Sequence, residues 1–268
     1  MSIETIFSVR GKTAIVTGGA SGIGLAITEA LAENGAVVAV IDQDADRLAS
    51  EKNRLAEAGL EIHTYTADLA DRHQAEATMA SAIKQLGGLD IVFANAGITG
   101  GYGPASKHTN AGSFENFDID LWNRTIDVNL NGVLYTLRAS IPALKQRQAG
   151  KIVVTSSIAG LRANTAIGYP YTASKTALVN LIKTLALELA EANIQVNGLA
   201  PGPFHTNINN GRFHDPSNAA LAASSVPLGR LAQPHEIKGL ALLLASSASS
   251  YITGAVIPID GGKTAGGI

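Results

Sequence analysis

The sequence predicts an α/β protein, with one doubly wound domain whose seven-stranded, mainly parallel sheet is flanked by helices on both faces. Short apolar runs alternate with segments of helical periodicity along the whole 268-residue chain. This alternation is typical of parallel βαβ units joined by right-handed crossovers. No internal repeat and no linker-like change of composition interrupts it. We therefore expect residues 1–268 to form a single domain.

Seven apolar runs are expected to form the strands, and several are apolar throughout, as strands buried on both faces are. They lie at residues 14–16, 37–41, 62–67, 89–94, 151–155, 194–199 and 255–259. Pro258 lies in the last run, and a proline within a strand favours an edge position or a bulge.

The segments between these runs have helical spacing. Helices are expected at residues 23–34, 44–58, 71–86, 120–148, 171–192 and 234–245. Asp71 and Gln74 resemble a capping pair at the start of the third helix. Residues 98–118 and 203–228 have no such pattern and are expected to be substrate loops, because long loops within a compact domain are usually functional.

Composition excludes several classes of protein. Apolar residues make up 46% of the chain and charged residues 16%, which is the reverse of a disordered composition. The formal net charge of −2 argues against nucleic acid or an anionic membrane as a partner. Without cysteine, disulfides and thiolate chemistry are excluded, and no histidine spacing indicates a metal site. With no long apolar run and no secretory signal, a cytoplasmic location is expected.

A glycine-rich loop follows the first predicted strand, with the spacing G-x-x-x-G-x-G from Gly18 to Gly24. Glycines let the backbone approach a pyrophosphate, and the N-terminus of the next helix attracts the anion. Asp42 ends the second strand, where a carboxylate binds the ribose hydroxyls of an adenosine and repels a 2′-phosphate. Gln43 and Asp44 offer no arginine for that phosphate, so NAD is expected rather than NADP. The alternative is that Asp42 is only a helix N-cap.

Tyr171 and Lys175 are four residues apart in a predicted helix, so their side chains share one face. A neighbouring ammonium group lowers the pKa of a phenol, which would let Tyr171 exchange a proton near neutral pH. Such a pair by itself is common on half-exposed helices. Here residues 155–160, at the end of the fifth strand, add serine hydroxyls that can bind a substrate oxygen.

Together these motifs resemble the short-chain dehydrogenase/reductase family over residues 11–262, in a Rossmann-like fold. The loop from Thr17, the Asn-Ala-Gly after the fourth strand, the Tyr-x-x-x-Lys pair and the Asp-Gly-Gly ending at Gly262 are all similar to family motifs. The resemblance implies the catalytic residues Asn129, Ser157, Tyr171 and Lys175. It implies the cofactor-binding residues Gly18, Ser21, Gly22, Ile23, Gly24, Asp42, Asp68, Leu69, Asn95, Ala96, Gly97, Tyr171, Lys175, Pro201, Gly202 and Thr206.

The resemblance also implies hydride transfer between a nicotinamide and a carbinol carbon, without a metal. Tyr171 takes or donates the proton, and Lys175 lowers its pKa and binds the nicotinamide ribose. Ser157 polarises the substrate oxygen, and Asn129 helps to position a water that relays protons through Lys175.

Three features depart from the family pattern. Ala94 replaces the first asparagine of the usual Asn-Asn-Ala-Gly. The spacing between Ser157 and Tyr171 is one residue longer than is common, which leaves Ser156 as an alternative. The first substrate loop is longer than in simple members. Further candidates for the substrate pocket are Tyr102, His108, Arg162, Asn164, Tyr169, Phe204, His205 and Asn207.

The leading interpretation is an NAD-dependent oxidoreductase acting on a secondary alcohol or carbonyl compound, such as a sugar, polyol, hydroxy acid or cyclic alcohol. The alternatives are an NADP-dependent carbonyl reductase, a non-catalytic NAD-binding sensor, and an NAD-containing dehydratase or epimerase. The helix predicted at residues 171–192 is apolar nearly all round, which favours burial on more than one side. A homo-oligomer is therefore expected, and the resemblance to the family implies a homotetramer; the alternative is a monomer with unusually apolar helices.

Overall fold

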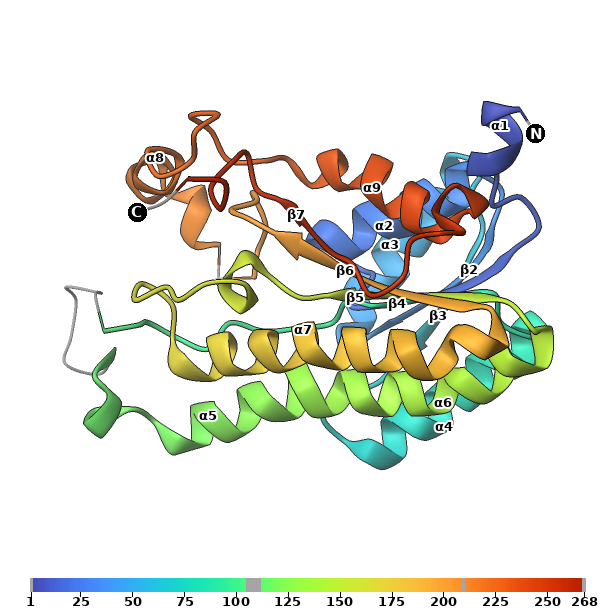
Figure 1. The fold of residues 1–268 in the computed structure, drawn as a ribbon, viewed down its shortest axis with the longest axis horizontal. Helices are drawn as coiled ribbons and strands as arrows, with labels where there is room; N and C mark the ends of the chain where they lie inside the picture. The colour runs from blue at the N-terminus through green and yellow to red at the C-terminus, as the bar shows by residue number, and fades with distance from the viewer. Residues whose placement is uncertain (1, 105–111, 209–210, 267–268) are drawn as a thin grey trace.

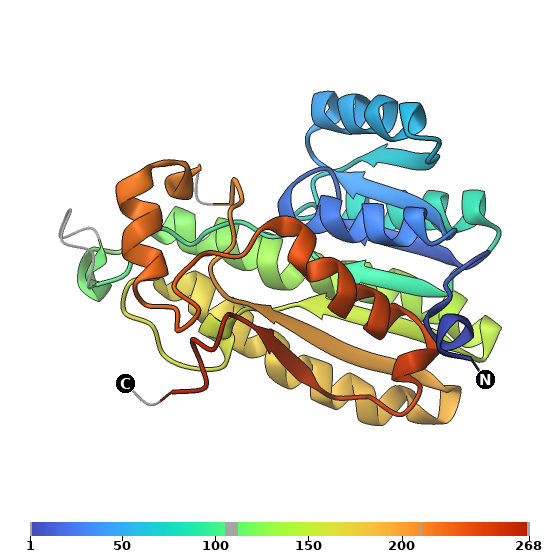
Figure 2. The same cartoon turned by 90° about the horizontal axis from the view of Figure 1, so that it is seen from above.

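A seven-stranded sheet forms the centre of the molecule, in the order β3-β2-β1-β4-β5-β6-β7 (Figures 1 and 2). The structure is a computed structural model that describes residues 2–104, 112–208 and 211–266. Its strands are β1 (Thr13–Thr17), β2 (Val37–Asp42), β3 (Ile62–Thr66), β4 (Ile91–Ala94), β5 (Gly150–Thr155), β6 (Ile194–Pro201) and β7 (Val256–Ile259). Every pairing is parallel. Pro258 lies in the edge strand β7, as its missing N–H group predicts.

Helices cover both faces of the sheet (Figure 1). One face is covered by α2 (Gly22–Glu33), α3 (Ala45–Glu57) and α9 (Lys238–Ala245). The other face is covered by α4 (Arg72–Leu86), α5 (Ile119–Ile126), α6 (Gly132–Arg147) and α7 (Tyr169–Leu189). Two short helices lie apart from these layers, α1 (Ile3–Phe7) and α8 (Pro216–Ala223). The doubly wound fold predicted from the alternation of segments is confirmed.

Two hydrophobic cores explain why the strands are apolar throughout. In β1, Ala14 and Val16 pack into the core on the α2 face, whereas Ile15 between them packs into the core on the opposite face. Successive side chains of a strand point to opposite faces. Because both faces are covered, every position of β1 is buried.

Two expected segments differ in detail from the structure. The helix predicted at 120–148 contains a π-helical turn, Asp127–Asn131, between α5 and α6, and periodicity alone cannot detect one inserted residue. The irregular region predicted at 203–228 contains α8, which begins with the N-cap Asp215 and a proline. Its eight residues are too few for a clear periodic pattern.

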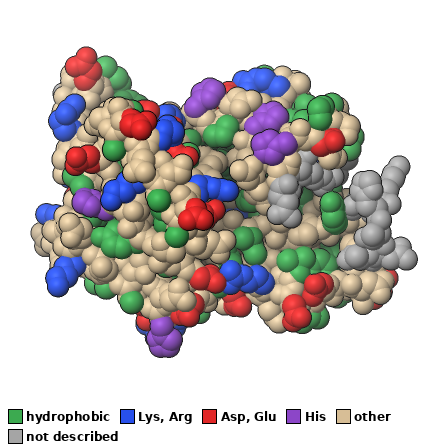
Figure 3. Space-filling model, turned by 180° about the vertical axis from the view of Figure 1, so that it is seen from behind, with side chains coloured by type: hydrophobic (Ala, Val, Ile, Leu, Met, Phe, Trp, Pro, Cys, Tyr) green, Lys and Arg blue, Asp and Glu red, His purple; other side chains and the backbone are tan. Residues whose placement is uncertain are grey.

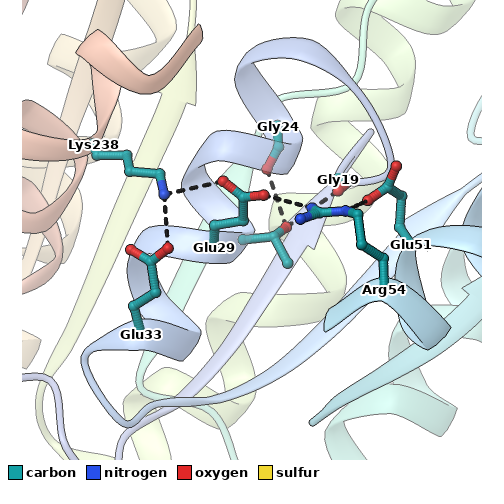
Figure 4. A network of polar contacts seen from close by, with 8 residues as sticks. Gly19, Gly24, Glu29, Glu33, Glu51, Arg54 and Lys238 are labelled. Carbon is teal, nitrogen blue, oxygen red and sulfur yellow. Dashed lines mark hydrogen bonds and ion pairs between the residues drawn. The ribbon is translucent and has the colours of Figure 1, made fainter. Parts of the chain in front are cut away.

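An ion-pair network joins the three helices on one face of the sheet (Figure 4). The Glu29 carboxylate of α2 contacts Arg54 of α3 at 2.5 Å and Lys238 of α9 at 3.0 Å. Glu51 pairs with Arg54 at 2.6 Å, and Glu33 pairs with Lys238 at 2.8 Å. The network holds the body of α2 between its two neighbours, and α2 is the helix that follows the glycine-rich loop.

Charges of both signs are interspersed on the face drawn in Figure 3. This face therefore has no continuous basic or acidic field. Among the described residues, no helix is long and apolar enough to cross a membrane.

The expectation that α7 is buried on more than one side is only partly met within one chain. Leu178, Ile182 and Ala186 face the core, and Leu185 is partly buried. Leu187, in contrast, is 82% exposed. The outer side of α7 therefore presents an apolar side chain that this chain does not cover.

Candidate active site

A pocket of about 820 Å3 lies at the carboxyl ends of the strands and extends towards α8. Every residue predicted to bind the cofactor lines this pocket, from Gly18 after β1 to Thr206 after β6. Ser157, Tyr171 and Lys175 line it too, whereas Asn129 lies behind its wall and is fully buried. The parallel sheet brings these segments together because each follows the carboxyl end of a strand.

The glycine-rich loop has the shape of an anion cradle. Gly18 has a φ of +62°, and a Cβ there would lie 2.8 Å from the Ala96 backbone. A Cβ on Gly24 would collide with the carbonyl oxygen of Gly18. Ser21 precedes α2 without capping it by its side chain, so the first N–H groups of α2 face the pocket rim and can bind a phosphate.

Thr28 fixes this loop from within α2. Its hydroxyl lies 3.0 Å from the Gly24 carbonyl oxygen and 3.3 Å from that of Gly19, and it is fully buried. The loop geometry therefore depends on a side chain nearly two turns into the helix. The sequence pattern of glycines did not indicate this residue.

Asp42 lies at the end of β2 and is not the N-cap of the following helix. Asp44 is that cap, because its carboxylate accepts a 2.9 Å hydrogen bond from the Arg47 N–H group. Asp42 accepts hydrogen bonds of 3.2 Å from the N–H groups of Ala20 and Asp44. The alternative interpretation of Asp42 as an N-cap is therefore wrong, and its carboxylate lines the pocket.

Arg47 is a pocket residue that the sequence analysis missed. It lies in the first turn of α3, lines the same end of the pocket as Asp42, and has its Nε 3.5 Å from the Asp44 carboxylate. Because α3 begins only three residues after Asp42, its first turn lies at the end of the pocket that Asp42 lines. The residues that directly follow Asp42 in the sequence do not indicate a cation at this end of the pocket; only the position of Arg47 in the folded chain does.

Asn95 connects three strands at the pocket floor. Its amide nitrogen donates to the carbonyl oxygens of Thr17 at 3.2 Å and Gly18 at 3.3 Å. Its carbonyl oxygen accepts a 3.0 Å hydrogen bond from the Thr155 hydroxyl. Asn95 therefore sets the spacing of β1, β4 and β5 where their ends meet. Asp68, further along the pocket, is paired with Arg124 at 2.9 Å.

Tyr171, Ser157 and Lys175 form a connected group. The Ser157 hydroxyl lies beside the Tyr171 phenol closely enough to lower its pKa as a hydrogen-bonding partner, and the Lys175 nitrogen lies 5.6 Å from the Tyr171 ring centroid. Lys175 is 2% exposed and donates a 2.8 Å hydrogen bond to the Thr155 carbonyl oxygen. The helical spacing predicted that Tyr171 and Lys175 share a face, and they do so.

The protonation of this group differs from the sequence-based expectation. Desolvation raises the pKa of the Tyr171 phenol above its ordinary value, and the hydrogen bond with Ser157 opposes that rise. A phenol pKa below its ordinary value was expected from the neighbouring Lys175, but the net shift is upward, because desolvation outweighs the lowering effect of Ser157. Burial lowers the pKa of Lys175 itself to about 8, because a low-dielectric site disfavours the charged ammonium form.

The two candidate serines have different partners. The Ser156 hydroxyl is buried and donates a 2.9 Å hydrogen bond to the Lys175 carbonyl oxygen. The Ser157 hydroxyl accepts a 3.1 Å hydrogen bond from the Ala159 N–H group and also meets Tyr171. Ser156 is therefore engaged with the backbone of α7, and Ser157 is the serine beside the phenol.

Asn129 lies in the π-helical turn Asp127–Asn131, and π turns often occur at functional sites. Its amide accepts a 2.8 Å hydrogen bond from the Ile98 N–H group and donates one of 2.9 Å to the Ile98 carbonyl oxygen. A Cβ on Gly97 would lie 3.2 Å from the Asn129 oxygen and 3.4 Å from the Lys175 nitrogen. Asn129 thus holds the segment after β4 against Lys175.

The other end of the pocket is formed by the two predicted substrate loops. Of the further candidates, Tyr102, Asn164, Phe204 and Asn207 line the pocket, whereas Arg162, Tyr169 and His205 do not. Residues 105–111 of the first loop, with His108, lie outside the described residues. Sequence analysis missed the pocket-lining side of α8, with Leu221 and Ala222, as well as Lys263. None of these three belongs to a recognisable motif.

The described residues suit a dinucleotide with a nicotinamide beside Tyr171. The N-terminus of α2 and the glycine-rich loop can bind phosphates, and the Asp42 carboxylate can accept hydrogen bonds from ribose hydroxyls. Within the described ranges, no group of three or more His, Asp or Glu side chains is placed to hold a metal ion. The Tyr171 phenol is a proton donor or acceptor that lies beside a serine hydroxyl and a buried cation.

Comparison with known proteins places this site in a family. Residues 18–264 match the family described as enoyl-(acyl carrier protein) reductase. The chain is 35% identical to 3beta-hydroxysteroid dehydrogenase 2 of Eggerthella lenta, with 96% of each chain covered. It is 34% identical to sorbose reductase of Candida albicans, which covers 98% of this chain and 90% of that protein.

A solved structure supports the same family assignment. A gluconate 5-dehydrogenase from Burkholderia cenocepacia, in complex with NADP and tartrate, superimposes with a TM-score of 0.89 at 31% identity, covering 99% of this chain and 100% of that one. The chain belongs to the short-chain dehydrogenase/reductase family, an oxidoreductase family whose similar members act on hydroxyl and carbonyl groups.

Proposed function

We propose that this short-chain dehydrogenase/reductase transfers a hydride between NAD and a secondary alcohol or its ketone, with Tyr171 as the acid or base. The observation that carries the proposal is the contact of Ser157 with Tyr171 beside buried Lys175, inside the pocket that the glycine loop also lines. The substrate classes considered are sugars, polyols, hydroxy acids and cyclic alcohols.

Tyr171 takes the hydroxyl proton during oxidation and returns it during reduction. Ser157 holds the substrate oxygen at hydrogen-bond distance from the phenol and stabilises charge that develops on that oxygen. The bound nicotinamide supplies the hydride acceptor or donor. The raised pKa of Tyr171 favours the protonated phenol, which is the form needed to donate a proton to a carbonyl substrate.

Lys175 acts from the lining of the pocket, and Asn129 acts from behind it. The ammonium group of Lys175 stabilises the phenolate form of Tyr171 and binds the nicotinamide ribose hydroxyls. Asn129 fixes the segment from Gly97 to Ile98 and positions a water that passes protons to Lys175. Both side chains are buried, so their orientation is set before a substrate enters.

The phosphates are held by Gly18, Ser21, Gly22, Ile23 and Gly24, and the adenosine by Asp42, Asp68 and Leu69. The nicotinamide half is held by Asn95, Ala96, Gly97, Pro201, Gly202 and Thr206, together with Tyr171 and Lys175. All of these residues line the pocket. A Cβ on Gly22 would lie 3.1 Å from the Thr206 side chain, so these two segments of the proposed cofactor site pack directly against each other.

NAD is the proposed cofactor because the Asp42 carboxylate repels a 2′-phosphate. One observation favours a second candidate, an NADP-dependent carbonyl reductase. Arg47 lines the pocket near Asp42, and a guanidinium group is well suited to bind a phosphate. The gluconate 5-dehydrogenase to which the chain is similar was solved with NADP. Cofactor choice therefore depends on whether Asp42 or Arg47 dominates the field at the ribose.

We further propose that residues 1–268 act as one catalytic domain, with substrate loops near 98–118 and 203–228, and that the chain forms a homotetramer. Exposed apolar side chains on the outer helices support association. Leu187 on α7 is 82% exposed and Leu134 on α6 is 40% exposed. Light scattering tests the oligomer, and a species with only the 27.6 kDa mass of one chain would exclude it.

The test of function is a paired titration with NAD and NADP, followed by a turnover screen that monitors reduced nicotinamide. Sugars, polyols, hydroxy acids and cyclic alcohols are offered with the oxidised cofactor, and their ketones with the reduced one. Turnover of one class with NAD supports the proposal. NAD binding without turnover of any class supports a sensor instead, and preference for NADP supports the carbonyl reductase.

A further inference from the structure

Among the described residues, few charged side chains line the proposed substrate half of the pocket. The charged residues that line the pocket among the described ranges are Asp42, Asp44, Arg47, Asp68, Lys175 and Lys263. The first four lie at the adenosine end, after β2 and β3, and Lys175 belongs to the group around Tyr171. Lys263 is therefore the charged side chain at the far, substrate end of the described pocket.

Lys263 follows β7, in a C-terminal segment that packs against the residues after α8. Its Nζ is 2.6 Å from the Ser225 hydroxyl, which follows the end of α8. No carboxylate among the described residues lies within ion-pair distance of it. A half-buried ammonium group that meets only a neutral hydroxyl keeps most of its capacity to bind an anion.

The nearest carboxylate is already engaged by other groups. Asp260 accepts a 2.9 Å hydrogen bond from the Gly262 N–H group through one oxygen. Its other oxygen accepts hydrogen bonds from the N–H group and the hydroxyl of Thr264, at 2.7 and 2.6 Å. Asp260 therefore holds the turn after β7 and is not bonded to the ammonium group of Lys263.

A second cation reinforces the positive potential. The Arg162 guanidinium group donates hydrogen bonds of 3.2 and 3.3 Å to the carbonyl oxygens of Lys263 and Gly266, and no described carboxylate is paired with it. Desolvation, followed by the charge of Arg162, lowers the pKa of Lys263, and Asp260 opposes this. Two neighbouring cations destabilise each other, and a bound anion relieves that repulsion.

We propose that Lys263 is a specificity-determining residue that binds a carboxylate on the substrate. The substrate class is then a hydroxy acid or keto acid whose carbinol or carbonyl carbon lies at Tyr171 and whose carboxylate lies at Lys263. This inference rests on the proposed function for the reacting end of the substrate. The anion site itself follows only from Lys263, Arg162 and the pocket that Lys263 lines.

The competing explanation is that Lys263 only tethers the C-terminal segment to Ser225. The two explanations differ in what Ser225→Ala does. A tether is lost equally in Lys263→Met and Ser225→Ala, and its loss affects charged and neutral substrates alike. An anion site is lost in Lys263→Met, retained in Lys263→Arg, and largely retained in Ser225→Ala.

The probes are three keto acids of increasing length, acetoacetate, levulinate and δ-oxohexanoate, each with its methyl ester. The ester keeps the ketone and removes the charge. Affinities are measured by calorimetry in a Tyr171→Phe background saturated with NADH, in which turnover is blocked. The ratio kcat/KM is measured for the same compounds with Tyr171 intact. Lys52→Met, an exposed lysine of α3, is the matched control.

We expect Lys263→Met to weaken binding of at least one keto acid by about ten- to a hundredfold, as for other charge-assisted hydrogen bonds, and to leave its ester unchanged. Lys263→Arg should restore most of the lost affinity, and Lys52→Met should have no effect. The inference is overturned if no acid binds more tightly than its ester, or if Ser225→Ala reproduces the loss.

The two proposals fail separately in this design. If the acids bind through Lys263 but neither acids nor esters are reduced, the anion site stands and the proposed reaction fails. If acids and esters are reduced equally well, the reaction stands and the anion site fails.

Discussion

The ammonium group of Lys175 donates a 2.8 Å hydrogen bond to the carbonyl oxygen of Thr155, the last residue of β5. This contact ties α7 to the carboxyl end of the central sheet and holds the ammonium nitrogen 5.6 Å from the Tyr171 ring centroid. A buried cation with one fixed acceptor cannot move far when a ligand enters the pocket. The position of Tyr171 is therefore set by the sheet as well as by its own helix.

Removing the phenol hydroxyl should abolish turnover and spare cofactor binding. In Tyr171→Phe the proton donor is lost, and positioned acid–base groups typically contribute about 10²- to 10⁴-fold to rate. The measurements are kcat on any substrate found in the screen and the Kd for NAD. Tyr251→Phe is the control, since Tyr251 is fully exposed. Retention of more than about a tenth of the activity would exclude Tyr171 as the acid or base.

Lys175 should make stability increase with pH in the alkaline range. Its pKa is lowered by burial from 10.5 to about 8, so the unfolded chain binds more protons between these values. The penalty for burying the charge is complete below about pH 8 and is relieved as pH rises towards 10.5. At most it amounts to about 3 kcal/mol.

Urea unfolding at about pH 7.5 and about pH 9.5 measures this effect. The unfolding free energy should rise with pH in the wild type, and that rise should be smaller in Lys175→Met. Lys151, whose pKa burial also lowers to about 8, contributes in the same direction in both proteins. An equal pH dependence in the two proteins would contradict the assignment.

Cofactor preference should shift when the strand acid is neutralised. Asp42→Asn removes the repulsion of a 2′-phosphate and one charged acceptor for the ribose hydroxyls. The ratio of the Kd for NADP to the Kd for NAD should fall by about ten- to a hundredfold. Arg47→Gln is the matched variant. If it weakens NADP binding in the Asp42→Asn background and leaves NAD binding unchanged, Arg47 is the group that binds the phosphate.

Replacing a glycine by alanine should have opposite effects on stability in the glycine-rich loop and in an ordinary helix. A Cβ on Gly24 would collide with the Gly18 carbonyl oxygen, whereas a Cβ on Gly239 in α9 meets nothing within 4 Å. Gly24→Ala should therefore lower the Tm and abolish NAD binding. Gly239→Ala should stabilise the protein by about 0.5–1 kcal/mol without changing the Kd. Normal NAD affinity in Gly24→Ala would contradict the close approach at this loop.

The ion-pair network of Figure 4 should contribute a modest, pH-dependent stability. Burial raises the pKa of Glu29, but the hydrogen bonds and charges of Lys238 and Arg54 outweigh it and leave the pKa below its ordinary 4.5. The stabilisation is then present above pH 4.5 and is lost as pH falls through the lowered value. Lys238→Met should cost about 1 kcal/mol at neutral pH, because its contacts are only partly screened.

The control for this network is again Lys52→Met, whose side chain is exposed. The loss in Lys238→Met should shrink in acid, where Glu29 becomes protonated. A loss that stayed the same in urea unfolding down to about pH 3 would mean that packing, and not charge, explains the effect.

Much of the fold and the site could be predicted because the relevant signals are local in the sequence. The strands of a parallel sheet are buried on both faces, so each appears as an apolar run, and all seven were located. The glycine loop, Asp42 and the Tyr171–Lys175 pair are also local patterns. Each follows a strand end or lies within one helical turn, where chain geometry fixes the relative positions.

The remainder depends on contacts between segments far apart in the chain. The π-helical turn at Asn129 is stabilised by hydrogen bonds to Ile98, 31 residues away, and helical periodicity carries no trace of them. The choice between Ser156 and Ser157 depends on which hydroxyl meets the Lys175 carbonyl and which meets Tyr171. Two adjacent serines in a sequence give no indication of which one has which partner.

The order of the strands and helices along the chain, the glycine-rich loop and the Tyr171–Lys175 pair were all evident from the sequence alone. The tertiary structure was needed to show that desolvation raises the pKa of Tyr171, that Arg47 lines the pocket near Asp42, and that Lys263 lines it beside Ser225. The physical reason is that local spacing fixes backbone conformation, whereas desolvation and electrostatic potential sum over every segment that folding brings near a side chain.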